Sequence, residues 1–532
     1  MFDRRLPARG APALALSAVM LVAACGVATP TPTPGPGVTA PAAPQVLVYA
    51  NPTTFPDLDP STGFSNDNVV VSNVYETLTR WDPGSDPQIQ PLLATSWSAS
   101  ADGLTWTFNL RPGVTFHDGT PLNAAAVKYS IERTMSLGRG AAFIWDAVEA
   151  ITVVDDLTVE FTLSYEAPLD LIASSGYGAW IMSPTATEGK DNAWFNAGNG
   201  SGTGPYMFYS YEKDQRVVLK RFDAYWGGWK PGQFDTVIFR VVGDAITRQK
   251  MVESGEADFT HAIPTENLPA LRANPNVRVV TNPSYRNMLI LLNTAKAPTN
   301  DVRVRQALSF AFPYQVAIDA TMAGYATRSR GPVPAALLDG ADRVPQYTHD
   351  LDRARALLAD AGYADGGIAL TLTITAGDTV AQQTAELYRA ELAKIGVDLT
   401  VKALNWEAQW SLARGDPTQA QDMFMFYWWP TYPTPYDFLF NMFHSEDTPN
   451  FNLGYYKNPA FDALINEANT LLASDRAAAM RMFVEASTMI VDDAAAIFVN
   501  DQQNIHVVSA SLKGFVDNPA YPHVLFVYDL SR

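Results

Sequence analysis

The amino-acid sequence predicts an α/β fold, and the clearest sign is a strand–helix–strand pattern between residues 370 and 401. Leu370–Ile374 alternates apolar and polar residues as a half-buried strand does, and Val397–Val401 repeats the alternation. Between them, Val380–Ile395 has the apolar period of an amphipathic helix and is closed by Gly396. A strand, a helix and a second strand within about thirty residues indicate a βαβ unit.

Local patterns also predict the elements in the first part of the chain. Val46, Val48 and Ala50 fall at alternate positions, which predicts a first strand. Residues 66–80 carry an apolar stripe at the helical period and predict a helix. Trp106–Leu110 alternates again as a half-buried strand, and Asn123 is placed to cap a helix whose apolar residues recur every fourth position.

The later part of the chain has the same mixture of elements. Asp350 is placed to cap a helix that ends at Gly362, and Met423–Phe426 is a short apolar run typical of a buried strand. Phe461–Ala473 and Ser474–Ile490 predict two helices that cover a face of the sheet.

The N-terminal residues have the pattern of an export signal. Three arginines precede Ala11–Ala24, which is apolar but too short for a stable membrane span. Cys25 is the one cysteine of the chain, and its surroundings resemble a bacterial lipobox, in which the cysteine is acylated. We expect residues 1–24 to be a lipoprotein signal peptide and Cys25 to carry the lipid. The alternative is a plain secretory signal with an incidental cysteine.

Residues 25–44 are rich in proline and threonine. Such a sequence cannot build a core and behaves as an extended tether. Lipid and tether together would hold residues 45–532 at the outer face of the bacterial cytoplasmic membrane, on its periplasmic or extracellular side.

The composition is that of a soluble globular protein. The 532 residues are 47% hydrophobic and 17% charged, and this length suits a body of several lobes. The formal charge of −18 argues against nucleic acid as a partner, because nucleic acids select a basic surface. The same charge mildly favours neutral or cationic ligands.

The sequence offers little that would support catalysis. Its six histidines lack metal-ligand spacing, and it contains neither a nucleophile elbow nor a P-loop. His117 fits a hydrogen-bonded turn, and the glycine-rich run 198–204 fits a turn between domains. We therefore expect no catalytic residue, no metal and no cofactor, and a binding protein rather than an enzyme.

Residues 427–438 combine large aromatic side chains with three prolines. Pro430, Pro433 and Pro435 remove backbone donors, so we expect neither a helix nor a central strand here. Rigid aromatic rings bind ligands at small entropic cost, which favours an aromatic lining of a ligand cleft. The alternative is a buried loop that packs on the core.

Several blocks of sequence, collinear from about residue 46 to the C-terminus, share the pattern of one known family. The blocks are Tyr75–Pro83, Pro91–Trp97, Leu110–Pro121, Gly202–Tyr206, Arg221–Trp226, Gly255–Asp258, Asp301–Leu308 and Asn458–Ile465. Together they resemble the family 5 extracellular solute-binding proteins of ATP-binding-cassette (ABC) importers, the family of the dipeptide-, oligopeptide- and nickel-binding receptors.

The resemblance implies a two-lobed periplasmic-binding-protein fold (type II, cluster C) with an additional inserted small lobe. Lobe I would comprise residues 45–84, 205–292 and 505–532, the inserted lobe residues 85–204, and lobe II residues 293–504. The two large lobes would close over a ligand held between them. The implied protein is a monomer that delivers its ligand to the permease and ATPase subunits of an importer.

The implied cleft would be lined at the junctions of strands and loops, where an extended ligand finds main-chain partners and aromatic walls. The expected ligand-binding residues are Phe64, Ser65, Asn66, Tyr285, Arg286, Asn287, Trp406, Trp428, Trp429, Tyr432, Tyr436 and Asp437. Two alternatives stay open: Arg286 as a solvated strand residue and Trp406 as a core residue.

The expected ligand is a peptide, with one observation against it. Peptide-binding members commonly carry an aspartate for the ligand's ammonium near residues 427–438, whereas this chain has Thr431 and Thr434 there and a displaced Asp437. A buried ammonium needs a charged partner, so an oligosaccharide is the alternative ligand. Rival functions are an exported glycan or peptide hydrolase and a sensor or adhesin with the same fold.

Overall fold

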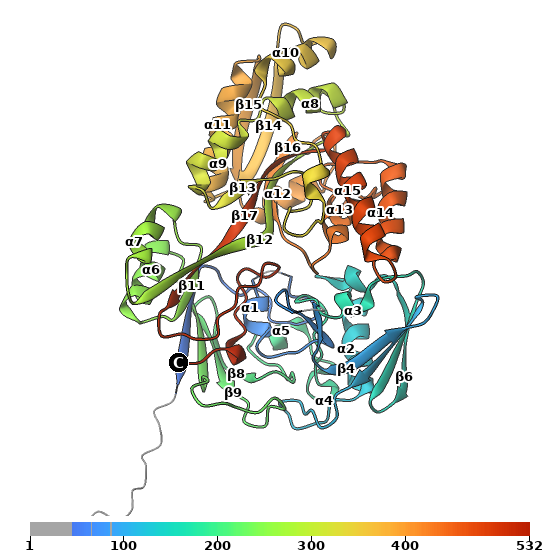
Figure 1. Cartoon of the computed structure of the whole chain (residues 1–532), viewed down its shortest axis with the longest axis vertical. Helices are drawn as coiled ribbons and strands as arrows, with labels where there is room; N and C mark the ends of the chain where they lie inside the picture. Colours follow the sequence, from blue (N-terminus) through green and yellow to red (C-terminus); the bar gives the residue numbers. More distant parts are fainter. Residues whose placement is uncertain (1–44, 65, 86–87) are drawn as a thin grey trace, which may run out of the picture. The chain divides into compact units, whose positions relative to one another are not determined.

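The computed structural model describes residues 45–532 except 65, 86 and 87, so the signal peptide, Cys25 and the tether lie outside the described residues. Figure 1 shows the course of the chain. The strands of the large sheet are β1 (Val46–Asn51), β8 (Tyr206–Glu212), β9 (Arg216–Arg221), β10 (Thr236–Val241), β11 (Phe259–His261), β12 (Val277–Leu292), β13 (Ala326–Arg328), β14 (Ile368–Thr375), β15 (Val397–Leu404), β16 (Met423–Trp428) and β17 (Ala496–Ser509). Within the described residues they form one mixed, eleven-stranded sheet in the order β15-β14-β16-β12-β17-β11-β1-β10-β9-β8, and β13 pairs with β17.

Two smaller sheets come from the segment between residues 79 and 163. One is the ribbon of β2 (Thr79–Trp81) and β3 (Ile89–Pro91), and the other has the order β4-β5-β7-β6. The strands of the latter are β4 (Ala94–Ala99), β5 (Thr105–Leu110), β6 (Val148–Asp155) and β7 (Thr158–Leu163). Helix α2 (Ala124–Leu137) packs on this sheet, and its N-cap Asn123 accepts a hydrogen bond from the Ala126 amide at 2.9 Å. The predictions of a strand at 106–110 and of a helix after Asn123 are confirmed.

The remaining helices surround the sheets (Figure 1). They are α1 (Asn68–Val71), α3 (Leu169–Ile172), α4 (Pro184–Thr187), α5 (Asn192–Phe195), α6 (Ala245–Ser254), α7 (Leu268–Arg272), α8 (Val302–Phe310), α9 (Tyr314–Met322), α10 (Leu351–Asp360), α11 (Thr379–Ala393), α12 (Trp406–Ala413), α13 (Pro435–Phe443), α14 (Pro459–Leu471) and α15 (Arg476–Asp492). None of the helices in the described part of the chain is long and apolar enough to cross a membrane.

The predicted βαβ unit is present. Strands β14 and β15 run parallel in continuous register from Ile368–Val397 to Thr375–Leu404, and α11 packs against both. The cap at Asp350 is confirmed as well, since its side chain accepts a hydrogen bond from the Arg353 amide at 2.8 Å. The predicted α/β class is therefore confirmed.

Two long strands join the halves of the large sheet. β12 and β17 pair antiparallel, with β16, β14 and β15 beyond β12 and with β11, β1 and β10 beyond β17. Their register shifts between Pro283 and Asn287. Such an irregularity bends the strand and re-aims the side chains within it, and Arg286 lies in this stretch.

The helix predicted for residues 66–80 is wrong beyond its first turn. Helix α1 ends at Val71, local hydrogen bonds continue only as far as the Tyr75 amide, which donates to the Val71 carbonyl, and from there on the backbone bonds to distant segments. The Gly204 amide donates to the Val74 carbonyl at 3.0 Å, and the Ile181 amide donates to the Glu76 carbonyl at 3.0 Å. Tertiary hydrogen bonds therefore override the local apolar period.

The same contact explains the glycine-rich run. A side chain at Gly202 would place its Cβ 2.1 Å from the Val74 carbonyl oxygen, and one at Gly200 would place it 2.2 Å from the Tyr75 hydroxyl. The glycines are required because two stretches of main chain lie in contact. His117 secures the run, since its Nε2 lies 2.8 Å from the Gly204 carbonyl and its Nδ1 accepts from the Gly202 amide at 3.4 Å. The prediction of a hydrogen-bonded histidine is confirmed.

The prediction that residues 427–438 contain no helix is also wrong, because α13 begins at Pro435. A proline is tolerated in the first turn of a helix, where its missing N–H would have no partner. The Thr434 hydroxyl caps this helix by accepting a hydrogen bond from the Tyr436 amide at 3.3 Å. Strand β16 extends to Trp428, so residues 429–434 alone form the connecting loop.

Candidate functional site

Two large cavities adjoin in the structure. The first, the aromatic chamber, has a volume of about 690 Å³ and is lined by aromatic rings from segments far apart in the sequence. Its lining includes Phe64, Tyr177, Trp406, Trp410, Phe426, Tyr427, Trp428, Trp429, Thr431 and Phe451, together with Arg139, Arg286 and Asp378. Its rings contact one another: Trp428 and Trp410 have centroids 5.1 Å and 5.3 Å from Phe451.

The second cavity, the polar chamber, has a volume of about 1110 Å³. Much of its polar lining comes from the middle of β17, from the end of β11 and the residues that follow it, and from the start of α11. Its lining includes Asn66, His261, Glu266, Gln383, Gln502, Gln503, Asn504, His506 and His523, together with Arg286, Asp378 and Trp429.

Three side chains line both chambers and mark their junction: Arg286, Asp378 and Trp429. The Arg286 guanidinium lies over the Tyr427 ring, 4.2 Å from its centroid. Asp378 is the N-cap of α11, where Oδ1 accepts from the Ala381 amide at 2.9 Å. Trp429 donates from Nε1 to the Tyr177 hydroxyl at 3.3 Å. A cation, an anion and an amphipathic ring thus meet at one place.

Tyr427 lies between the two charges of the junction. Burial raises the pKa of its hydroxyl well above the ordinary value, and the nearby Asp378 carboxylate raises it further while Arg286 opposes the shift. In the part of the chain that the structure describes, no ion pair within 4.0 Å joins Arg286 and Asp378. The Asp378 carboxylate interacts with the Tyr427 hydroxyl instead.

The histidines of the polar chamber are held by hydrogen bonds. Nδ1 of His261 lies 2.6 Å from the Tyr49 hydroxyl, and Nε2 of His523 lies 2.8 Å from Oδ1 of Asn68. Burial lowers the pKa of His523 to about 3 and that of His261 well below its ordinary value. Both rings are accordingly neutral near pH 7 and add no positive charge to the chamber.

The structure brings together about half of the residues predicted for the site. Phe64, Trp406 and Trp428 line the aromatic chamber, Asn66 lines the polar chamber, and Arg286 and Trp429 line both. Trp406 is 42% exposed, so the alternative of a core residue does not describe it. Ser65 lies outside the described residues.

Two predicted residues on β12, Tyr285 and Asn287, line neither chamber. Tyr285 packs against Trp81 with ring centroids 5.7 Å apart, and its amide donates to the Pro519 carbonyl at 2.9 Å. Asn287 is fully buried and donates from Nδ2 to the Pro332 carbonyl at 2.8 Å. Alternation along the strand sends these neighbours of Arg286 to other surroundings.

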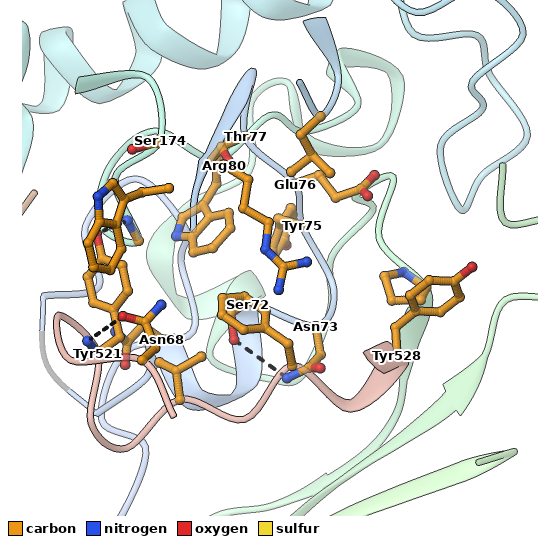
Figure 2. A pocket seen from close by; sticks show the side chains of 18 of the residues that line it. Asn68, Ser72, Asn73, Tyr75, Glu76, Thr77, Arg80, Ser174, Tyr521 and Tyr528 are labelled. Carbon is orange, nitrogen blue, oxygen red and sulfur yellow. Dashed lines mark hydrogen bonds between the residues drawn. The ribbon is translucent and has the colours of Figure 1, made fainter. Parts of the chain in front are cut away.

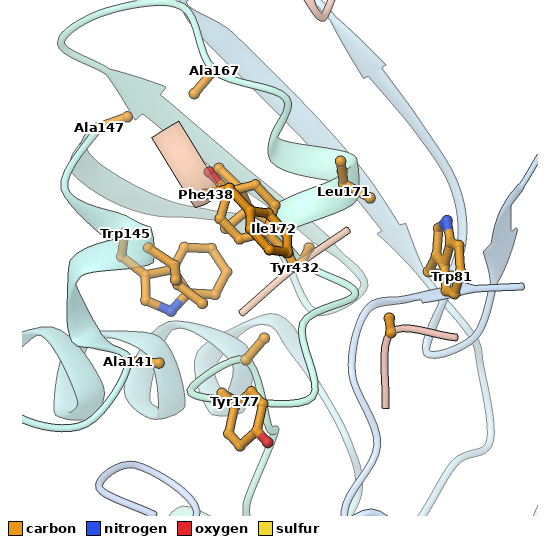
Figure 3. Packing of buried hydrophobic residues seen from close by; sticks show 14 of the residues in the cluster. Trp81, Ala141, Trp145, Ala147, Ala167, Leu171, Ile172, Tyr177, Tyr432 and Phe438 are labelled. Carbon is orange, nitrogen blue, oxygen red and sulfur yellow. The ribbon is translucent and has the colours of Figure 1, made fainter. Parts of the chain in front are cut away.

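Tyr432, Tyr436 and Asp437 line a third cavity of only about 40 Å³. Figure 3 shows Tyr432 and Phe438 packed with Ile172 near Trp145, in the largest hydrophobic cluster. Asp437 is 1% exposed, and burial raises the pKa of its carboxyl to about 7, against hydrogen bonds from Thr431 and Trp428. A carboxyl so placed does not face either chamber.

The two threonines of this segment have separate surroundings. Thr434 is the N-cap of α13, whereas Thr431 lines the aromatic chamber. The Thr431 carbonyl accepts hydrogen bonds from Ser175 Oγ at 2.8 Å and from the Tyr521 hydroxyl at 3.1 Å. The loop after β16 is thus bonded to two segments distant in sequence.

A further small cavity of about 70 Å³ lies beside these segments (Figure 2). Its lining includes Tyr521 and Glu76, and the Glu76 carboxyl accepts hydrogen bonds from the Tyr225 hydroxyl at 2.8 Å and from Trp226 Nε1 at 2.9 Å. Burial raises the pKa of Glu76 to about 7. This volume is too small for a peptide and suits ordered water.

Sequence reasoning missed several residues that line the chambers. Asp378 carried one signal, its position as a cap before the predicted helix 380–395. Tyr427 belonged to the aromatic segment but was not selected. Tyr177, Phe451 and His523 carried no local signal, because they reach the chambers only through the tertiary fold.

Comparison with known proteins assigns the family. A model described as "Bacterial extracellular solute-binding proteins, family 5 Middle" matches residues 88–450. The chain is 30% identical over 493 residues to the "Probable D,D-dipeptide-binding periplasmic protein DdpA" of Escherichia coli strain K12, covering 91% of this chain and 93% of that protein. It is 31% identical over 495 residues to the glutathione-binding protein GsiB of Pectobacterium atrosepticum, with the same coverage of 91% and 93%.

A solved structure shares the fold. The periplasmic binding protein DppA of Helicobacter pylori, in complex with peptide STSA, superposes with a TM-score of 0.80 at 25% identity. The match covers 91% of this chain and 98% of that chain. The mixed sheet with surrounding helices is thus the two-lobed fold of the periplasmic binding proteins, as the sequence blocks predicted.

The family match spans most of the folded body, and the two relatives align over almost their whole length. The proteins of this family bind solutes for transport and are not enzymes, which confirms the prediction of a binding protein. The chain belongs to the bacterial extracellular solute-binding proteins of family 5.

Proposed function

We propose that this protein captures an extracellular peptide in the two chambers and delivers it to the permease and ATPase subunits of an ABC importer. The observation that carries the proposal is the junction of an aromatic and a polar chamber at Arg286, Asp378 and Trp429. The chambers offer rings for side groups and polar atoms for a main chain. The relatives named for a dipeptide, for glutathione and for a bound peptide support a peptide as ligand.

The proposed lobes are those expected from the resemblance: residues 45–84, 205–292 and 505–532 for lobe I, 85–204 for the inserted lobe and 293–504 for lobe II. The four-stranded sheet of residues 94–163 and the strands β12 and β17, which link both halves of the large sheet, support this division. Both chambers draw residues from either side of it. Ligand-driven closure then requires that the ligand bind the closed arrangement more tightly than the open one.

Anchoring through a lipid on Cys25 remains part of the proposal, with a monomeric body held outside the cytoplasmic membrane. Cell fractionation tests it. The wild type should sediment with membranes, and Cys25→Ser should be released into the soluble extracytoplasmic fraction. Equal membrane association of both proteins would contradict the anchor.

An oligosaccharide is the second candidate ligand, and the aromatic chamber is the observation that favours it. Trp406, Trp410 and Trp428 line this chamber, and aromatic rings can pack against the apolar faces of sugar rings. Neither Asp437, which is buried, nor Thr434, which caps a helix, supplies a charge to the chambers.

One screen separates these ligands. Purified protein is heated with di- to pentapeptides and, in parallel, with cello- and xylo-oligosaccharides. A peptide that raises the melting temperature supports the proposal, because a ligand that binds the folded state alone stabilises it. A response to the saccharides alone would replace the peptide by the oligosaccharide, and no response to either panel would contradict both. Turnover of the same compounds would instead indicate a hydrolase.

A further inference from the structure

One buried hydroxyl joins the three proposed lobes. Tyr521 belongs to lobe I. Its hydroxyl accepts a hydrogen bond from the Gly176 amide of the inserted lobe at 2.9 Å and donates to the Thr431 carbonyl of lobe II at 3.1 Å. Tyr521 and Thr431 are both buried. A polar group buried in this way is costly to leave without its hydrogen bond, so these bonds resist separation of the lobes.

Ser175 adds a second bond between the inserted lobe and lobe II. It is fully buried, and its Oγ lies 2.8 Å from the Thr431 carbonyl and 2.8 Å from the Tyr177 carbonyl, so the hydroxyl donates to both. A Cβ at the adjacent Gly176 would lie 3.1 Å from Cζ of Tyr521. The glycine therefore allows the main chain to approach the Tyr521 ring closely enough for its amide to reach the hydroxyl.

Thr431 is fixed from the side of lobe II as well. Its amide and hydroxyl donate to the buried carboxyl of Asp437, while its carbonyl accepts from Ser175 and Tyr521. We call the hydrogen bonds among Ser175, Gly176, Thr431 and Tyr521 the clasp. All three polar groups of Thr431 have protein partners, so the clasp is complete without any atom of a ligand.

The clasp continues directly into the wall of the aromatic chamber. Trp429, two residues before Thr431, donates from Nε1 to the hydroxyl of Tyr177, which follows Ser175 by two residues. Trp429 and Tyr177 line the aromatic chamber, whereas Ser175 and Tyr521 line neither chamber. A ligand that packs on the two rings therefore contacts the segments that the clasp joins, but not Ser175 or Tyr521.

We propose that Tyr521 is a positioning residue: together with Ser175 it binds the Thr431 carbonyl, holds Trp429 in the chamber wall and raises the population of closed lobes. The inference rests on the proposed function and on its division into lobes. The apparent affinity of a ligand that requires the closed arrangement is proportional to the population of that arrangement. Loss of the clasp therefore weakens the binding of every ligand by the same factor.

The first measurement needs no ligand. X-ray scattering of the free protein should give a larger radius of gyration for Tyr521→Phe and for Ser175→Ala than for wild type, because each variant loses a hydrogen bond between lobes. Hydrogen exchange of the Gly176 amide should become about tenfold faster in Tyr521→Phe, since this amide loses its acceptor. Thermal melts verify that both variants are folded.

The second measurement is the affinity for two peptides of different composition from the screen of di- to pentapeptides. In calorimetric titrations, Tyr521→Phe should weaken both by one common factor of about three to ten. Tyr528→Phe is the matched control on the same C-terminal segment. Its hydroxyl donates to the Gly227 and Gly228 carbonyls at 2.8 Å and 2.9 Å, all within lobe I, so this variant should keep the radius and both affinities of wild type.

Each contrary result has its own meaning. Equal radii of wild type, Tyr521→Phe and Ser175→Ala would overturn the clasp, whatever the ligand is. Larger radii with unchanged affinities would overturn its coupling to the chambers, and unequal losses for the two peptides would assign Tyr521 to direct ligand contact instead. The same changes in Tyr528→Phe would overturn the assignment to Tyr521. Larger radii in the two clasp variants, with no peptide bound by wild type, would support the clasp and overturn the proposed peptide binding.

Discussion

Trp429 and Tyr432 belong to the same short segment but have different surroundings. Trp429 is half-buried, lines both chambers and donates one hydrogen bond to Tyr177. Tyr432 is 5% exposed and packs in the largest hydrophobic cluster. Position in the sequence alone does not separate a ring that lines a chamber from a core ring.

We expect Trp429→Ala to weaken ligand binding by about tenfold or more, because buried aromatic anchors contribute most of the energy of a binding site. The free protein should keep its melting temperature within a few degrees. Calorimetric titration with a ligand from the peptide screen measures the first effect, and a thermal melt measures the second. Unchanged affinity would remove Trp429 from the site.

Tyr432→Ala should lower the stability of the free protein and should not by itself weaken ligand binding. Truncation of a large core ring costs about 3 to 5 kcal/mol of unfolding free energy, so urea denaturation of the free protein should reveal a clear loss of stability. Any loss of affinity should follow that instability. A stable Tyr432→Ala protein with weakened binding would instead place Tyr432 in the ligand site.

The buried carboxyl of Asp437 should make the stability of the protein depend on pH. Burial raises the pKa of this carboxyl to about 7 in the folded protein, so the folded state keeps a proton that the unfolded chain releases above its lower, ordinary pKa. The stability that Asp437 contributes is full below the ordinary pKa and is lost as the pH rises to about 7. Asp437→Asn is uncharged at every pH, and it should gain stability relative to wild type across this window by up to about 4 kcal/mol.

Urea midpoints of both proteins at pH 4, 6 and 8 measure this difference. Comparison with the variant cancels the other shifted groups, such as Glu76 and His523, which stay the same in both proteins. Parallel pH profiles would show that the Asp437 carboxyl is not buried as the structure has it.

At the scale of elements, the sequence predicted well wherever a helix or strand is decided by its own residues. The unit β14–α11–β15 and the caps Asn123 and Asp350 are such cases. It failed for residues 66–80, whose main chain bonds to the glycine run, and at Pro435, where proline begins a helix. Both failures depend on partners or positions that an apolar period does not encode.

Substitutions in the glycine run test why the helix predicted for residues 66–80 does not form. Gly202→Ala would place a methyl carbon 2.1 Å from the Val74 carbonyl oxygen and 2.9 Å from the Tyr75 Cα, and backbone atoms cannot yield without breaking the contact. We expect a loss of about 3 kcal/mol or more, or failure to fold. Gly255→Ala is the matched control: its φ is +78° but its Cβ meets open space, so the cost should be about 1 to 2 kcal/mol.

Thermal melts and soluble yields of the two variants measure the loss of stability at each position. The contact between residues 74–75 and the glycine run predicts a much larger effect at Gly202 than at Gly255. Equal and small effects would mean that the main-chain contact does not exist in solution.

At the scale of the whole molecule, the fold was predictable because its sequence blocks are collinear with a known family, and the comparisons confirm that family. The site was predictable only in part. Residues such as Phe64 and Trp429 sit in segments with a visible signal, whereas Tyr177 and Phe451 join the aromatic chamber through packing between distant segments. Residues from distant segments line the chamber together only in the folded protein, so the sequence alone does not identify all of them.

The proposed lobes should move toward one another when the ligand binds. A peptide that contacts both sides of the junction, through Arg286 on β12 and Asp378 on α11, should draw them together. We expect X-ray scattering to show a smaller radius of gyration at saturating ligand, and a stability gain of about 2.7 kcal/mol at a ligand concentration 100 times Kd. Trp429→Ala should require proportionally more ligand for both changes. A stability gain without any change in radius would show that the ligand binds without closure.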